Sequence, residues 1–203
     1  GGQSFGNLLI AALNGICGNF EDAVAKTNEI LRVRGQVLPV TGRNINLCAE
    51  LENGAYVYGE SSIPPEAIRQ NSPIARVFLE PEKPEAAGMA LNAIKKADVI
   101  IIGPGSLFTS IIPNLLVDGI SNAIKSSVAR KILICNNKLI GAEALKPYIE
   151  DKSEQTMPTD KDRQLLRENG IILIENNFID VKKGYIRHDA DRIAGIVYNL
   201  ICD

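Results

Sequence analysis

The sequence predicts a doubly wound α/β fold with a mainly parallel sheet and one local antiparallel hairpin. Four consecutive β-branched apolar residues, Val99–Ile102, are typical of a strand buried on both faces of a parallel sheet. Strand and helix patterns alternate over residues 76–136, which is the order of a doubly wound sheet. Asn53-Gly54 separates two alternating segments and indicates a hairpin turn.

The remaining elements follow from apolar periodicity and from capping residues. Asn19 is placed to cap a helix whose first turn holds Glu21 and Asp22. The helix before it, at 8–16, is apolar enough to be buried. Helices are expected at 8–16, 20–31, 84–96, 118–127, 143–151, 160–168 and 189–201, strands at 37–40, 45–51, 55–60, 76–80, 99–102, 131–136 and 171–175, and a proline-containing loop at 63–73.

The composition indicates an ordinary globular protein, expected as a single α/β domain over residues 1–203. Apolar residues make up 45% of the chain and charged residues 23%. The net charge of −2 shows no basic footprint, which argues against a nucleic-acid partner. No apolar run reaches the roughly 20 residues that span a bilayer, so membrane insertion is not expected.

The cysteines and the single histidine argue against a metal or triad chemistry. Cys17, Cys48, Cys135 and Cys202 lie far apart and match no metal or redox spacing. Each has apolar neighbours, so we expect small buried hydrophobes in a reducing compartment. With His188 as the only histidine, a multi-histidine metal site cannot be built from this chain, and no metal ligand is assigned.

The candidate binding loop follows the apolar strand directly. Gly103, Pro104, Gly105 and Ser106 allow a sharp turn that exposes backbone N–H groups, and the hydroxyls of Thr109 and Ser110 follow where a helix would begin. A loop of this kind at the carboxyl end of a parallel strand binds anions in many α/β folds. The same residues also fit a tight turn with ordinary capping, so phosphate binding and simple capping both remain open.

Two further places combine similar chemistry. Ser4, Gly6 and Asn7 lie at a helix start, where they could hold a phosphate or only cap the helix. Arg187 has a planar fork suited to phosphate or carboxylate, although an isolated arginine is more often a solvated charge. Asp189 is placed to cap the last helix, and His188 fits a structural role.

The hairpin residues have a simpler interpretation. Glu50, Glu52 and Glu60 are expected on a solvent-facing side rather than as paired acid–base carboxylates. Tyr56 and Tyr58 share one face because successive strand residues alternate. They could form a contact surface or cover the sheet.

Six segments in order resemble the gluconeogenesis factor family, a sister of the 2-phospho-L-lactate transferases. The segment from Gly103 to Leu116 resembles the most distinctive motif of the family. The others are Ser4-Phe5-Gly6-Asn7-Leu8, Arg34-Gly35-Gln36-Val37-Leu38-Pro39, Leu47-Cys48-Ala49-Glu50-Leu51, Gly59-Glu60-Ser61 and Ile186-Arg187-His188-Asp189. The sister family typically has Gly-Pro-Ser-Asn-Pro where this chain has Gly103-Pro104-Gly105-Ser106-Leu107, which favours the gluconeogenesis factors.

The resemblance implies a cytoplasmic, Rossmann-like regulatory protein that binds a UDP-sugar and supports cell shape and envelope growth on gluconeogenic carbon sources. It leaves a homodimer open. By resemblance, the ligand is shared by the loop at 103–110, the helix start at 4–7, Tyr148 against the nucleotide and Arg187 on the nucleotide-sugar. Catalytic residues stay unassigned. The alternative is a transferase of deazaflavin coenzyme synthesis that uses nucleotide-activated phospholactate and Mg²⁺, with few titrating residues required.

The chain also departs from the family pattern. The family begins with a strand and a Gly-Gly-Gly-Thr-Gly loop, of which only Gly1-Gly2 could be a remnant. It carries another loop and a helix after the strand that ends at Asn136. Segments are therefore expected to be missing before residue 1 and near 136–137.

Overall fold

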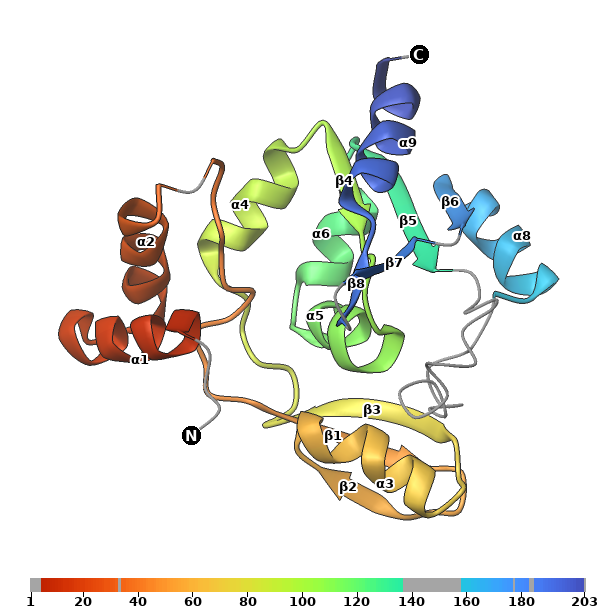
Figure 1. Ribbon diagram of the computed structural model, residues 1–203, viewed down its shortest axis with the longest axis horizontal. Helices are drawn as coiled ribbons and strands as arrows, with labels where there is room; N and C mark the ends of the chain where they lie inside the picture. Colours follow the sequence, from red (N-terminus) through yellow and green to blue (C-terminus); the bar gives the residue numbers. More distant parts are fainter. Residues whose placement is uncertain (1–4, 33, 137–157, 177, 183–184, 203) are drawn as a thin grey trace. The chain divides into compact units, whose positions relative to one another are not determined.

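The computed structural model describes residues 5–32, 34–136, 158–176, 178–182 and 185–202 (Figure 1). These residues form two compact units, and each unit is described by itself. The first unit contains Gly1–Asn46, Phe78–Ala97 and Pro113–Ser127; the second contains Leu47–Val77, Asp98–Ile112 and Val128–Asp203.

The described elements alternate between helices and strands along the chain. The helices are α1 (Phe5–Cys17), α2 (Phe20–Ile30), α3 (Ile63–Arg69), α4 (Gly88–Lys96), α5 (Ile112–Leu116), α6 (Ile120–Ser126), α8 (Asp160–Glu168) and α9 (Ala190–Cys202). The strands are β1 (Asn46–Leu51), β2 (Tyr56–Tyr58), β3 (Ile74–Glu80), β4 (Val99–Ile102), β5 (Arg130–Asn136), β6 (Ile171–Asn176), β7 (Ile179–Lys182) and β8 (Tyr185–His188). The predicted α/β class is confirmed.

The parallel sheet lies in the second unit and has the strand order β4-β5-β6. Strand β5 pairs in parallel with both neighbours, with Val99 opposite Arg130 and Lys131 opposite Ile171. All three strands therefore end at the same edge, which is where open α/β sheets bind ligands. The predicted parallel sheet is confirmed, and it consists of the strands expected at 99–102, 131–136 and 171–175.

A buried apolar cluster holds this sheet against α9. Ile132, Ile134, Ile174 and Phe178 form its centre, and both Ile132 and Phe178 are completely buried. One face of α9 packs against them through Ile193, Ile196, Val197 and Leu200. As predicted, Asp189 caps α9: its Oδ1 accepts a hydrogen bond from the Arg192 N–H at 3.0 Å.

The antiparallel sheet has the strand order β2-β1-β3. The predicted hairpin is confirmed, since β1 and β2 pair antiparallel and Gly54 takes the φ of +83° that such a turn requires. Strand β3, however, belongs to this sheet and not beside β4, so the expected continuous winding over 76–136 is wrong. From Arg76 onward its burial alternates, with Val77 and Leu79 buried on one face and Arg76 and Glu80 exposed on the other, as suits an antiparallel sheet with one solvated face.

Strand β4 is not buried on both faces as its apolar run predicts. Its residues are half-buried, and Ile101 is 44% exposed. Within the described residues β4 is at the edge of its sheet, with only β5 beside it. An uninterrupted apolar run therefore identified the strand and its parallel pairing but not its position in the sheet.

Residues 63–73 contain a helix where a loop was expected. Helix α3 begins with prolines in its first turn, where a missing backbone N–H costs no intrahelical hydrogen bond. Hydrogen bonds from Arg69 and Gln70 to the Glu66 carboxylate then lower the pKa of Glu66 to about 2. The prolines at the start of this segment thus begin a helix instead of excluding one.

Two elements of the first unit differ in the structure from those expected from the sequence. Residues 37–40 form no strand with any described residue; the carbonyl of Val37 instead accepts a hydrogen bond from Asn28 Nδ2 at 2.9 Å. Helix α4 begins at Gly88 rather than at Pro84, because the carbonyl of Pro84 accepts from the Asp118 N–H at 3.0 Å in a short parallel bridge.

Helix α1 has the expected position but not the expected burial. Leu13 is its only described buried residue, and Phe5 and Ile16 are 76% and 79% exposed. Apolar composition alone does not bury a helix; a covering element must lie on each apolar face. Helix α2 is capped as predicted, since Asn19 Oδ1 accepts from the Asp22 N–H at 2.8 Å.

The remaining expected elements and cysteines agree with the structure in part. Helix α8 has the predicted bounds, and Thr159 and Asp162 form a capping box at its start. The β7–β8 hairpin was not predicted, and the expected helix at 143–151 lies outside the described residues. Cys48 is buried as expected, whereas Cys202, at the end of α9, is exposed.

Replacing Phe178 by alanine tests the cluster beneath the parallel sheet. We expect Phe178→Ala to lower the free energy of unfolding by about 3–5 kcal/mol, because a fully buried ring leaves a cavity. Urea denaturation followed by far-UV circular dichroism measures the change. Leu165→Ala on α8, where Leu165 is 57% exposed, is the control and should change stability little. A comparable loss in both variants would contradict the assignment of the core.

Candidate functional site

The candidate loop begins at the carboxyl end of β4 with a tight backbone approach. Gly103 has a φ of +81°, a conformation that side-chain-bearing residues rarely adopt. A Cβ at this position would lie 2.9 Å from the Ile134 carbonyl oxygen of β5 and 3.3 Å from Ile111 Cδ1. Glycine at 103 is therefore required both by its φ and by the neighbouring strand.

Ser106 fixes the next turn through its hydroxyl. Its Oγ accepts hydrogen bonds from the Thr109 N–H at 3.3 Å and from Thr109 Oγ1 at 2.7 Å. The Ser106 carbonyl accepts from the N–H groups of Ser110 and Ile111 at 3.0 and 2.9 Å. These bonds form a π-helical turn, Leu107–Ile111, that continues directly into α5. The capping interpretation of Ser106 and Thr109 is thus confirmed, and it leaves ligand binding by the same loop open.

The capping hydrogen bonds do not use all the backbone N–H groups at the start of this turn. Within the described part of the chain, the backbone N–H groups of Gly105, Leu107 and Phe108 have no hydrogen-bond partner. Donors at a helix start suit an anion, because the helix dipole adds partial positive charge there. Ser110 is brought against Gly105, where an added Cβ would meet Ser110 Cβ at 3.2 Å. The loop therefore brings together the residues predicted at 103–110.

The ends of β5 and β6 supply further groups to the same sheet edge. Cys135 lies opposite Glu175, and Arg163 of α8 donates to both oxygens of Glu175 at 2.8 Å from Nε and from Nη2. The hydrogen bonds to Glu175 raise the pKa of Arg163. Burial, and secondarily the charge of Glu175, raise the pKa of the Cys135 thiol, which therefore stays protonated at neutral pH.

Sequence reasoning did not assign Cys135, Glu175 or Arg163 to this edge. The available signal was that the strands at 131–136 and 171–175 are parallel to 99–102, so that their last residues meet at one edge. Because Glu175 is fully engaged by Arg163, it holds α8 on β6 and offers no ready base.

The other predicted site residues are not joined to the loop by the described structure. Gly6 and Asn7 lie in the first turn of α1, in the first unit, whereas the loop lies in the second. Arg187 is the third residue of β8, opposite Asp180, and its side chain is outside the described part. Ser4 and Tyr148 also fall outside the described residues.

Two other kinds of site are absent from the described residues. Among these residues, no three His, Cys, Asp or Glu side chains gather where they could hold a metal ion. The described helices are also too short or too polar to cross a membrane.

The fold and the loop define an α/β protein whose candidate site lies at the carboxyl edge of a parallel sheet. Comparison with known proteins identifies the family within this class. The family model described as 2-phospho-L-lactate transferase CofD matches residues 1–147. The gluconeogenesis factor of Bacillus subtilis is 35% identical over 232 residues, covering 98% of this chain and 72% of that protein. The chain belongs to the CofD family and, within it, to the gluconeogenesis factors.

Another relative and a solved structure show the same similarity. A relative from Clostridium acetobutylicum is 41% identical over 99% of this chain, which spans only 52% of that protein's length. A crystal structure of a Bacillus halodurans protein matches with a TM-score of 0.78 and 33% identity, covering 97% of this chain and 72% of that one. The similar fold and the sequence identity thus extend over nearly the whole of this chain.

Gly103→Ala tests the close approach at the loop, and Gly170→Ala is its matched control. Gly170 also has a positive φ, of +68°, but nothing lies within 4 Å of an added Cβ. We expect Gly170→Ala to cost about 1 kcal/mol of unfolding free energy from its φ alone. Gly103→Ala should cost about 1–3 kcal/mol more because it also overpacks against β5. Equal losses in urea denaturation would show that Ile134 does not restrict position 103.

Proposed function

We propose that this chain is a nucleotide-sugar-binding regulatory protein and that the loop at 103–110 binds the phosphates of a UDP-sugar. The observation that carries the proposal is the start of the π-helical turn. There the N–H groups of Gly105, Leu107 and Phe108 have no acceptor within the described residues, at the carboxyl edge of a parallel sheet. Phosphate oxygens are strong acceptors for such a set of donors.

The rest of the ligand requires groups that the loop lacks. Arg187 would pair with phosphate through its planar guanidinium, and Tyr148 would pack against the uracil ring. Gly6 and Asn7, at the start of α1, would add further contacts together with Ser4. These assignments rest on the family resemblance of their segments.

The biological role proposed for the chain follows from the relatives. They are named gluconeogenesis factors, which supports a role in growth on gluconeogenic carbon sources. In this role, binding of the UDP-sugar in the cytoplasm would report the supply of envelope precursors and so support cell shape.

The family description supports one second candidate function. Residues 1–147 match a family described as 2-phospho-L-lactate transferase, so the same loop could position a nucleotide-activated phospholactate. A hydroxyl of an acceptor would then form the new phosphate ester as the nucleotide leaves. Backbone donors and a bound Mg²⁺ would stabilise the charge of that transition state, so few titrating side chains would be required.

Isothermal titration calorimetry with two ligands separates these functions. We expect the chain to bind UDP-N-acetylglucosamine more tightly than GDP, with or without Mg²⁺, because the proposed ligand is a uridine nucleotide-sugar. Tighter binding of GDP that depends on Mg²⁺ would favour the transferase. Failure to bind either ligand would contradict both functions.

Arg187→Ala should weaken binding of UDP-N-acetylglucosamine while leaving thermal stability nearly unchanged. Loss of a charge-assisted hydrogen bond to phosphate costs about 1.5–3 kcal/mol, or roughly 10- to 150-fold in affinity. Arg167→Ala removes the same charge from the last turn of α8 and serves as the control. If calorimetry gives the same affinity for Arg187→Ala and the original chain, Arg187 is a surface residue without a role in binding.

A further inference from the structure

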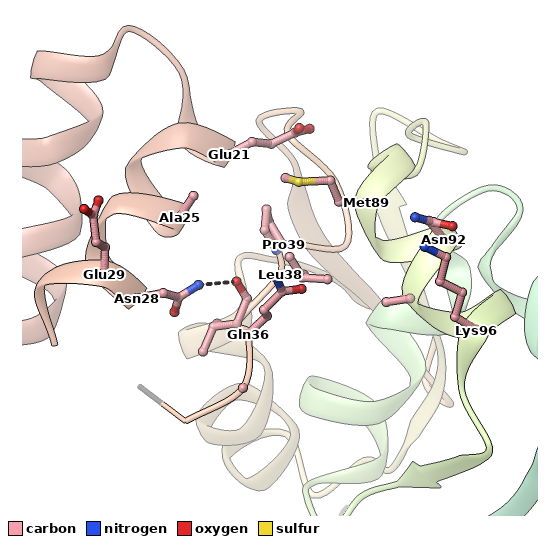
Figure 2. A pocket seen from close by; sticks show the side chains of 13 residues that line it. Glu21, Ala25, Asn28, Glu29, Gln36, Leu38, Pro39, Met89, Asn92 and Lys96 are labelled. Atoms are coloured by element: carbon pink, nitrogen blue, oxygen red, sulfur yellow. Dashed lines mark hydrogen bonds between the residues drawn. The ribbon is translucent and has the colours of Figure 1, made fainter. Parts of the chain in front are cut away.

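The first unit contains a groove that the proposed function does not use. It has a volume of about 650 Å³ and lies between one side of α2, one side of α4 and residues 35–39 (Figure 2). This volume is within the roughly 300–1,000 Å³ of ligand pockets. Its lining residues are Glu21, Ala25, Asn28, Glu29, Gly35, Gln36, Val37, Leu38, Pro39, Met89, Asn92, Ala93 and Lys96.

One side of this groove, called its floor below, is formed by residues 35–39. This segment includes most of the strand predicted at 37–40, but it pairs with no described strand. Asn28 Nδ2 donates to the Val37 carbonyl, and the Ala87 N–H donates to the Val40 carbonyl at 2.8 Å. Within the described chain, the N–H groups of Gln36 and Leu38 have no partner. A peptide lying along this floor could accept hydrogen bonds from them.

The middle of the groove is apolar and exposed. Val37 is 55% exposed and Met89 42%, and Ala25 and Ala93 face the same space from α2 and α4. A methionine is a deformable contact that accommodates different apolar side chains. An apolar residue of a bound peptide would remove this surface from water.

Two opposite charges flank the apolar middle. Glu21 comes from α2 and Lys96 from α4, and Figure 2 shows them on separate sides of the opening. Among the described residues neither has an ion-pair partner. Glu29, by contrast, is already paired with Lys26 at 2.6 Å. A second cavity, of about 380 Å³, adjoins Glu21 and is lined by residues 42–43 and 85–88. The groove thus offers a carboxylate and an ammonium group separated by an apolar stretch.

We propose that this groove binds a short extended peptide in which apolar residues separate a basic residue from an acidic one. The basic side chain pairs with Glu21 and the acidic side chain with Lys96. The peptide backbone adds as a strand beside residues 36–38, which fixes its direction. The groove shares no lining residue with the loop at 103–110, and the proposal does not depend on nucleotide-sugar binding.

Fluorescence anisotropy with labelled, end-blocked peptides tests the proposal on the complete chain. The probes are Lys-Val-Leu-Val-Glu, the reversed order Glu-Val-Leu-Val-Lys, and the uncharged Gln-Val-Leu-Val-Gln. We expect one charged order to bind most tightly, because strand pairing fixes the direction. N-methylation of its central amides should weaken it by removing backbone donors and adding bulk. Equal binding of all three probes, or no binding, would overturn the proposal.

Exchanging the two charges gives the decisive variant. Glu21→Gln and Lys96→Gln should each weaken the preferred peptide roughly two- to fivefold, as for exposed ion pairs. The double variant Glu21→Lys with Lys96→Glu should prefer the opposite peptide order. Lys95→Gln, next to Lys96 but outside the lining, is the control and should bind as the original chain does. An unchanged preference in the folded double variant, confirmed by circular dichroism, would refute the assigned charge contacts.

Discussion

Parallel pairing of β5 with both β4 and β6 is the interaction on which the second unit depends. It places the carboxyl ends of three strands at one edge, and it brings Ile132 and Ile134 into the cluster covered by α9. The same pairing puts the Ile134 carbonyl against Gly103. Core, strand order and loop shape therefore share one cause, and a change in β5 would alter all three.

Features set by neighbouring residues could be predicted from the sequence. Asn19 capped α2, Asn53-Gly54 formed the hairpin turn, and α8 had its expected bounds, because each depends on a few consecutive residues. Pairing between elements far apart along the chain was predicted for the parallel sheet but not elsewhere. Strand β3 pairs within the antiparallel sheet, and Phe5, Leu8 and Ile16 of α1 stay exposed, because both depend on which distant elements lie beside them.

The candidate loop was located correctly as a strand-to-helix turn, but its internal contacts were not foreseen. Glycine at 103 suggested freedom to turn; the approach to Ile134 shows a steric requirement as well. Serine and threonine fitted both ligand hydroxyls and ordinary capping; the hydrogen bond from Thr109 to Ser106 confirms the capping role and gives its partners. Tyr148 came from family resemblance alone, and the chemistry of Arg187 left a solvated charge open, since no local pattern marks a residue that acts from a distant segment.

The difference between two cysteines in the second unit has a practical consequence for labelling. The Cys135 thiol stays protonated beside Glu175, and thiols react with alkylating reagents and oxidants mainly as thiolates. Cys202 is exposed at the end of α9. A maleimide dye or spin label should therefore react faster at Cys202 than at Cys135, and so report on α9 before it reaches the sheet edge beside the candidate loop.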